Sequence, residues 1–246
     1  MTAQTGLLLI SHGSRSVRAA AEFDALAAQI RGERPDLPVE AGYLELAEPS
    51  LEQCLERLID RGLYRILAVP VMLFPALHVA EDIPGRLAHY QQQHPAMHIQ
   101  YGVEIGKSEK LIDAARNALV AVAADQADRL VLLVKGASNP AIAARAQDVL
   151  GALDHHFGYA STRLAFSGDK PPGLEEVLEE AVRDGISQVA VCPYFLFSGR
   201  LLDCAAKTVE RFRRTYAAPD IRISGALYNQ AGVRAAILEQ LQRFLP

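Results

Sequence analysis

The sequence predicts an α/β protein built from two tandem repeats, each a parallel sheet of about four strands with helices on both faces. Short apolar runs alternate with amphipathic segments on short connections, which is the pattern of parallel strands joined by crossover helices. The same order of segments then recurs at a constant offset of 123 residues. A chain of 246 residues with 50% hydrophobic and 22% charged residues has enough apolar material for two such cores.

The first strand is the apolar run at residues 7–10, which leads directly to His12 and Gly13. Residues 16–30 follow as an alanine-rich amphipathic helix, with Val17, Phe23 and Ile30 expected on its buried side. The other elements expected in the first repeat are a strand at 39–45, a helix from 48–50 to 61 with Pro49 in its first turn, a strand at 64–69, an apolar loop at 71–78, a helix at 82–92, a strand at 97–103 and a helix at 108–123.

Glycines and prolines recur at the offset of 123, which indicates an internal duplication. We therefore expect two domains, one at residues 1–124 that carries the chemistry and a degenerate copy at residues 125–246. The recurring pairs include Gly13 with Gly136, Pro49 with Pro172, Gly62 with Gly185, Pro70 with Pro193, and Gly102 with Gly225.

Three polar residues of the first repeat do not recur. Each lies at or just beyond the carboxyl end of a predicted strand, so all three are expected at the carboxyl edge of one sheet, where open parallel sheets bind ligands. Taken singly, each is also compatible with an ordinary surface residue. Together, two imidazoles and a carboxylate suit an exchangeable divalent ion such as Co²⁺, Fe²⁺, Ni²⁺ or Zn²⁺. The residues, with their counterparts, are His12 (Lys135), Glu45 (Gly168) and His78 (Leu201).

The loop before His78 is apolar and includes Phe74 and Leu77, so it is expected to form a wall for a large flat organic ligand. Arg15 is the best placed of several cations that could meet carboxylates at this edge. The others are Arg18, Arg86 and Lys107, and for each of these taken singly a solvated surface charge is the favoured interpretation.

Three ordered motifs, at residues 11–15, 43–50 and 70–84, resemble those of the class II sirohydrochlorin chelatases, in their long two-domain form. The resemblance implies two flavodoxin-like chelatase domains and ATP-independent insertion of a divalent metal into sirohydrochlorin. It assigns His12 and His78 as metal ligands and Glu45 as the conserved acid. Residues 135–140 replace the first motif in the second half, and residues 75–78 depart from the serine- or glycine-bearing loop that is usual in the family.

The same resemblance implies which substrates the protein binds and which residues contact them. The substrates would be sirohydrochlorin and the metal ion, with no permanently bound cofactor, and Ser14, Arg15, Phe74 and Leu77 would contact the tetrapyrrole. The two-domain form is associated with cobalamin synthesis, which favours Co²⁺, with Fe²⁺ insertion to give siroheme as the alternative. Metal insertion releases two pyrrole N–H protons, so Glu45 would act as a base or proton conduit, a role that an imidazole could share.

Two other functions compete with this interpretation. A histidine phosphatase also presents a His-Gly pair after its first strand, but an arginine precedes that histidine, whereas Ser11 stands here. A non-catalytic tetrapyrrole or metal carrier would use the same crevice. The remaining histidines have simpler roles: His89, His94 and His98 are expected to be solvated, and the pair at 155–156 to complement a helix dipole.

The composition of the chain limits its possible partners and its cellular compartment. A net charge of -4 argues against a general nucleic-acid binder. Three cysteines without metal-type spacing fit a reducing cytoplasm, and Cys192, after a buried strand, is expected to be a packed thiol. The N-terminal residues contain no signal peptide or membrane span. We therefore expect a cytoplasmic protein that is independent of membranes and acts as a monomer of two pseudo-symmetric halves.

Overall fold

The computed structural model describes residues 5–74, 81–136 and 139–244. The chain forms two compact units. The first unit comprises Met1–Leu111 together with Ala231–Pro246, and the second comprises Ile112–Gln230.

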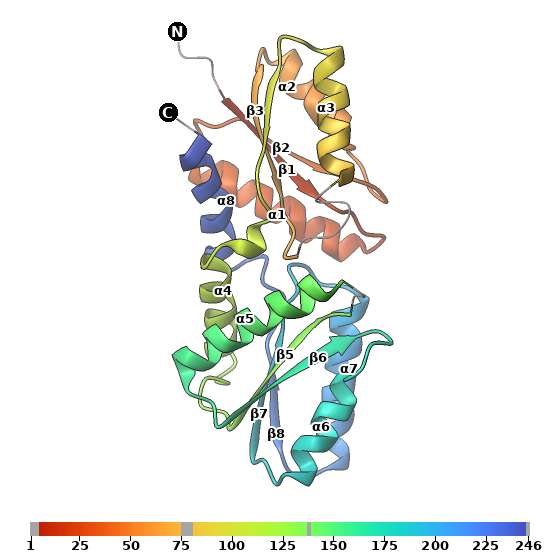
Figure 1. The fold of residues 1–246 in the computed structure, drawn as a ribbon, viewed down its shortest axis with the longest axis vertical. Helices are drawn as coiled ribbons and strands as arrows, with labels where there is room; N and C mark the ends of the chain where they lie inside the picture. Colours follow the sequence, from red (N-terminus) through yellow and green to blue (C-terminus); the bar gives the residue numbers. More distant parts are fainter. Residues whose placement is uncertain (1–4, 75–80, 137–138, 245–246) are drawn as a thin grey trace. The chain divides into compact units, whose positions relative to one another are not determined.

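The first unit is a four-stranded parallel sheet with helices on both faces (Figure 1). Helices α2 and α3 cover one face, and α1 and α8 the other. Its elements are β1 (Thr5–Ser11), α1 (Val17–Glu33), β2 (Val39–Tyr43), α2 (Leu51–Asp60), β3 (Arg65–Pro70), α3 (Ile83–Gln93), β4 (His98–Tyr101), the 3-10 helix η2 (Ile105–Lys107) and α8 (Ala231–Phe244).

The strand order in this sheet is β2-β1-β3-β4. The direction of winding reverses between β1 and β3, so the crevice beyond their carboxyl ends is the expected ligand position of a doubly wound sheet. Ser11 pairs with Tyr43 at the end of β1, and Ile10 pairs with Pro70 at the end of β3. The residues that follow β1, β2 and β3 therefore emerge at one edge.

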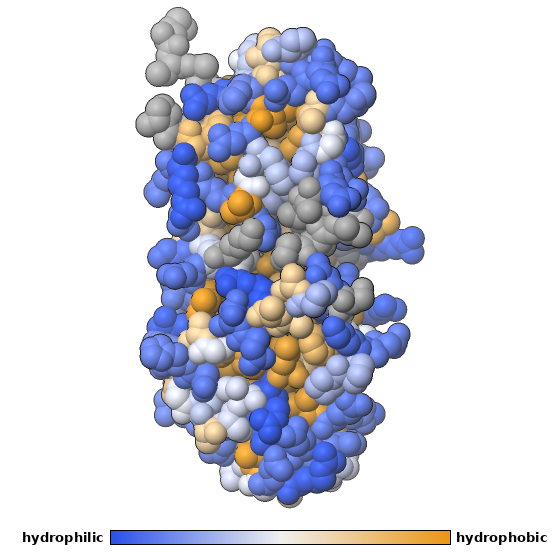
Figure 2. All heavy atoms as spheres, viewed as in Figure 1, coloured by the Kyte–Doolittle hydropathy of each residue, from blue (hydrophilic) through white to orange (hydrophobic). Residues whose placement is uncertain are grey.

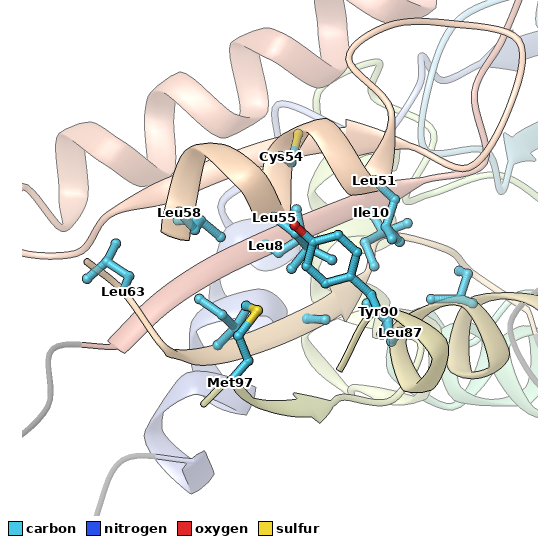
Figure 3. Close-up of a cluster of buried hydrophobic side chains, with 13 residues drawn as sticks. Leu8, Ile10, Leu51, Cys54, Leu55, Leu58, Leu63, Leu87, Tyr90 and Met97 are labelled. Carbon is cyan, nitrogen blue, oxygen red and sulfur yellow. The ribbon is translucent and has the colours of Figure 1, made fainter. Parts of the chain in front are cut away.

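Burial on both faces explains why β1 reads as a continuous apolar run. Leu7, Leu8, Leu9 and Ile10 are all fully buried. Leu8 and Ile10 point to α2 and α3, where they pack with the apolar faces of both helices (Figure 3). Because side chains alternate along a strand, Leu7 and Leu9 face the opposite layer.

The second unit repeats this architecture, with the strand order β6-β5-β7-β8. Helices α6 and α7 pack on one face of its sheet, and α4 and α5 lie on the other (Figure 1), where Arg116 bonds His156. Its elements are α4 (Lys110–Val120), β5 (Arg129–Lys135), α5 (Pro140–Phe157), β6 (Ser161–Ser167), α6 (Leu174–Arg183), β7 (Gln188–Pro193), α7 (Arg200–Thr215) and β8 (Asp220–Ile223).

The offset of 123 recurs in the elements themselves. Helix α2 maps residue for residue onto α6, and β3 maps onto β7. The compact units, however, are not cut at the repeat boundary near residue 124. The last helix of each repeat packs in the unit built mainly from the other repeat, since α8 belongs to the first unit and nearly all of α4 to the second. The division into residues 1–124 and 125–246 thus describes the repeat of the sequence, whereas the packing exchanges the terminal helices.

Two local expectations are wrong. Pro49 lies outside helix α2, because Ser50 is the N-cap and forms a capping box with Gln53. Val17 is not on the buried face of α1; its side chain is 85% exposed. It is the first residue of the helix, after the Ser16 N-cap, and points away from the face that buries Phe23 and Ile30.

Hydrophilic residues dominate the face drawn in Figure 2, where apolar residues form smaller groups between them. Among the described residues, no helix combines the length and apolarity that a membrane crossing requires.

Candidate functional site

His12 and Glu45 follow neighbouring parallel strands, and the strand pairing continues far enough to bring them together. Ser11 ends β1 and Tyr43 ends β2. Beyond these ends, the Leu44 N–H still donates to Ser11 O at 2.9 Å, and the Glu45 N–H donates to His12 O at 3.1 Å. The two side chains are therefore held by backbone bonds at adjacent positions of one sheet edge.

The two functional groups are in contact. His12 Nε2 lies 3.3 Å from Glu45 Oε1, and the side chains are 39% and 51% exposed. An exposed pair of this kind adds little to stability. Its chemical capacity is larger, because a neutral imidazole and a carboxylate are both ligands for borderline divalent ions and both proton acceptors.

Gly13 allows this close approach of the two loops. It has φ +99°, and a Cβ atom placed there would lie 1.7 Å from the carbonyl oxygen of Glu45. Any other residue would push the Glu45 backbone away from His12. A glycine after the first strand is therefore required by the neighbouring loop as well as by its own turn.

Replacing Gly13 by alanine is expected to lower both stability and activity. The left-handed conformation alone costs an L-residue about 1–2 kcal/mol, and the displaced Glu45 backbone adds to that cost. Gly62→Ala is the matched control, because Gly62 has φ +74° but open space where a side chain would project. Chemical denaturation of both variants checks this. An equal loss of stability in both, with full activity, would contradict the close-packing role of Gly13.

A hollow of about 490 Å³ adjoins Glu45. Three carboxylates line it, so the immediate surroundings of Glu45 are polar. Arg86 lies at its side and is bonded to Glu52 and to the carbonyl oxygen of Leu44. Its guanidinium is thus committed within the protein and does not project to solvent as a free cation. The lining residues are Leu44, Glu45, Glu81, Asp82, Gly85 and Arg86.

Of the other candidate residues, three lie in the described part of the chain and two lie outside it. Ser14 accepts a hydrogen bond from the Ser16 N–H at 3.0 Å, Arg15 is exposed, and Phe74 is half-buried after β3. Leu77 and His78 lie outside the described residues. Helix α3, which begins at Ile83 soon after them, packs on the same sheet.

Leu46 is a residue of this edge that the sequence analysis missed. It follows Glu45 directly, is 51% exposed, and has φ +65°, a conformation that leucine adopts only at a cost. Exposed Val17 lies beyond the end of β1. Neither the exposure of these two side chains nor the positive φ of Leu46 can be recognised in a sequence, since a leucine or valine near a loop ordinarily marks a buried position. Both are suited to contact with an apolar ligand surface.

Leu46→Gly is expected to leave the protein as stable as before or up to about 1 kcal/mol more stable, since release of left-handed strain offsets the entropy of a new glycine. Binding of a flat apolar ligand at this edge should weaken. Leu46→Ala separates the two effects, because it removes the side chain and keeps the strain. Thermal unfolding and ligand titration measure them; a Leu46→Gly protein that is clearly less stable than Leu46→Ala would refute the strain argument.

Cys192, His89 and His98 agree with their simpler interpretation, since both of these histidines are exposed, whereas His94 is half-buried and not simply solvated. His94 stacks on Tyr90 with ring centroids 4.5 Å apart, and His89 bonds Gln93. His155 and His156 lie in the last turn of α5. Cys192 is fully buried, and burial raises the pKa of its thiol to about 12. Within the described part of the chain, no three histidine, cysteine, aspartate or glutamate side chains form a metal-binding cluster.

Comparison with known proteins places both repeats in one family. The CbiX family model matches residues 6–122 and again residues 129–244. These two ranges reproduce the internal duplication.

The similar curated proteins are named for the insertion of two different metals, iron and cobalt. The chain is 30% identical to the sirohydrochlorin ferrochelatase of Priestia megaterium over 208 residues, which cover 83% of this chain and 78% of that protein. It is 23% identical over 226 residues to the sirohydrochlorin cobaltochelatase of the same organism, with 89% and 73% covered. Among solved structures, SirB from Bacillus subtilis with Fe³⁺ superposes with a TM-score of 0.86 at 25% identity, covering 98% of this chain and 95% of SirB. The chain thus belongs to the CbiX family, together with these sirohydrochlorin chelatases.

Proposed function

We propose that this chain inserts a divalent metal ion into sirohydrochlorin, with His12 and His78 as metal ligands and Glu45 as the proton acceptor. The observation that carries the proposal is the 3.3 Å contact between His12 and Glu45 at the carboxyl edge of the first sheet. The similar proteins, which are named sirohydrochlorin ferrochelatase and sirohydrochlorin cobaltochelatase, supply the reaction class. The metal ion is a substrate here, and no permanently bound cofactor is required.

The imidazole of His12 offers one nitrogen to the incoming ion. His78 follows β3, the strand across the switch point from β1, so a second imidazole from that segment would hold the ion from the other side of the crevice. Two protein ligands leave most coordination positions to water and then to the ring nitrogens, so the ion can be transferred. Both imidazoles must be neutral to bind it, so binding weakens in acid.

Glu45 would take up protons released by the ring. Each insertion removes two pyrrole N–H protons, and a carboxylate next to the metal ligand can accept one at a time and pass it to water through its exposed side. Val17, Leu46 and Phe74 would contact the face of the tetrapyrrole, and Ser14, Arg15 and the segment at Leu77 its periphery.

The second repeat is proposed to be a degenerate copy without catalytic residues. Lys135, Gly168 and Leu201 stand at the positions of the three proposed catalytic residues, and none of them combines metal ligation with proton uptake. We propose that the chain acts as a monomer, since one chain contributes both repeats; light scattering would check this. The three cysteines are free thiols, which suits the reducing cytoplasm that we propose as its compartment.

Co²⁺ is proposed as the physiological ion and Fe²⁺ as the alternative, because the long two-domain form that this sequence resembles is associated with cobalamin synthesis; the order of metal affinities does not choose between them. The test is an anaerobic assay in which the absorbance of sirohydrochlorin is followed with Co²⁺, Fe²⁺ or Ni²⁺, with and without protein. Rates above the spontaneous reaction are expected, highest with Co²⁺. Binding of the ring without faster insertion would instead indicate a carrier, and hydrolysis of an aryl phosphate would indicate a phosphatase.

A further inference from the structure

Arg86 connects three elements around the candidate site with a single side chain. Its Nε donates to Glu52 Oε1 at 2.8 Å and its Nη2 to Glu52 Oε2 at 2.5 Å, which makes a bidentate pair. Its Nη1 donates to the carbonyl oxygen of Leu44 at 2.7 Å. Arg86 lies in the first turn of α3, Glu52 in the first turn of α2, and Leu44 in the loop that carries Glu45.

The bond to Leu44 acts on the backbone directly before Glu45. The peptide group between Leu44 and Glu45 is held at both ends: its N–H, that of Glu45, donates to His12 O at 3.1 Å, and its carbonyl oxygen, that of Leu44, accepts from Arg86. The Glu45 side chain itself is half exposed, and Leu46 after it has a strained conformation. The loop thus depends on backbone anchors to keep the carboxylate beside His12.

The ionised carboxylate of Glu52 holds the Arg86 guanidinium in the orientation that reaches Leu44. Burial raises the pKa of the Glu52 carboxyl, but the hydrogen bonds from Arg86, from the backbone and from Ser50, together with the positive charge of Arg86, outweigh it, so that the net pKa lies below its usual range. Glu52 is therefore ionised near neutral pH and orients the guanidinium toward Leu44.

The second repeat provides an internal comparison. The counterpart of Glu52 is Glu175, which is retained and pairs with Arg211 at 2.6 Å. Arg211, however, stands two residues further along its helix than the counterpart of Arg86, which is Val209. Val209 is fully buried and apolar, so it cannot donate to the loop. An ion pair between the two helices is thus common to both repeats, whereas the bond to the loop accompanies the repeat that has Glu45.

We infer that Arg86 is a positioning residue for Glu45: through the Leu44 carbonyl it fixes the loop that holds the carboxylate next to His12. This inference rests on the proposed role of Glu45 in metal insertion. It also gives Arg86 a function different from that of a cation for substrate carboxylates, since all three of its guanidinium nitrogens are engaged within the protein.

The experiment compares Arg86→Ala and Arg86→Lys with Arg211→Ala, which breaks the corresponding ion pair of the second repeat. Arg86→Ala is expected to lower kcat about 10-fold or more, as the loss of outer partners of a metal site commonly does, with KM for sirohydrochlorin little changed. Arg86→Lys should recover only part of kcat, because an ammonium cannot serve both Glu52 and Leu44 with one fork. Arg211→Ala should keep the kcat of the unmodified chain.

Two further measurements separate positioning from a general loss of stability. In a Glu45→Gln background, Arg86→Ala should cause no additional loss of kcat, since the group that it positions has been removed. Hydrogen exchange of the peptide that spans residues 44–48 should be faster in Arg86→Ala than in Arg211→Ala. A full further loss of kcat in the Glu45→Gln background would overturn the inference, as would unchanged exchange of the loop.

The hydrogen-exchange comparison needs no enzymatic activity, so it decides whether Arg86 anchors the loop even if the protein proves not to be a chelatase. Failure of the proposed function would appear separately, as an unmodified chain that does not accelerate metal insertion or a Glu45→Gln variant with full kcat. In the latter case Arg86 has nothing catalytic to position, and the inference falls with the role of Glu45.

Discussion

Replacing His12 by alanine is expected to abolish most of the metal insertion while leaving the fold intact. Loss of an outer partner of a metal site typically costs about 10- to 100-fold, so loss of a direct ligand should cost at least about 100-fold. The effect on stability should stay within about 0.5 kcal/mol, because His12 is 39% exposed and its contact with Glu45 is a surface pair. Initial rates of insertion and the binding of the metal by calorimetry measure the two parts of the loss.

Lys135→Ala is the matched control for that variant. Lys135 is the counterpart of His12 and lies at the end of β5, the strand that corresponds to β1. Its replacement should leave the binding of the metal ion at the first repeat unchanged. If His12→Ala retained full insertion, or if Lys135→Ala lost as much metal binding, the assignment of His12 as a ligand would be wrong.

Glu45→Gln is expected to lower kcat by about 10²- to 10⁴-fold, the usual contribution of a positioned general base. The amide keeps the size of the side chain and loses the ability to accept a proton. Affinity for sirohydrochlorin should change little, because Glu45 acts on the reacting nitrogens and not on the periphery of the ring. Single-turnover absorbance kinetics, with the tetrapyrrole titrated separately by fluorescence, distinguish chemistry from binding.

Glu48→Gln tests whether any carboxylate of this loop would serve. Glu48 lies three residues further on and accepts a hydrogen bond from the Ser50 N–H at 3.0 Å, so its carboxylate already belongs to the start of α2. It should retain nearly all activity. A Glu45→Gln protein with an unchanged kcat would assign proton uptake to an imidazole or to water.

The sheet and its repeat could be predicted from the sequence because the determining interactions are local or periodic. Leu7 to Ile10 are buried on both faces, and a strand in that environment has to be apolar throughout. Helix α2 and its copy α6 follow from the same spacing of apolar residues at an offset of 123. The adjacency of His12 and Glu45 also follows, since residues beyond neighbouring parallel strands meet at one edge.

What the sequence could not provide are contacts between loops and helices that are far apart in the chain. The requirement for glycine at position 13 comes from the Glu45 carbonyl oxygen, 32 residues later. The role of Arg86 depends on the carbonyl of Leu44, an atom that every residue possesses. The exposure of Val17 reflects its place at the very start of α1, where the periodicity of a helix does not yet decide which side is covered.

The exchange of terminal helices between the repeats has a consequence for the order in which the protein can fold on the ribosome. The second unit ends at Gln230, whereas the first unit needs Ala231–Pro246 to be complete. Its helix α8 contributes Val233, Ile237 and Leu241 as fully buried side chains. The unit translated first is therefore the last that can close, a reversal of the usual succession in which an N-terminal domain folds while the rest is still being made. The sheet whose edge carries His12 and Glu45 consequently gains the cover of α8 only after the whole second unit has been translated.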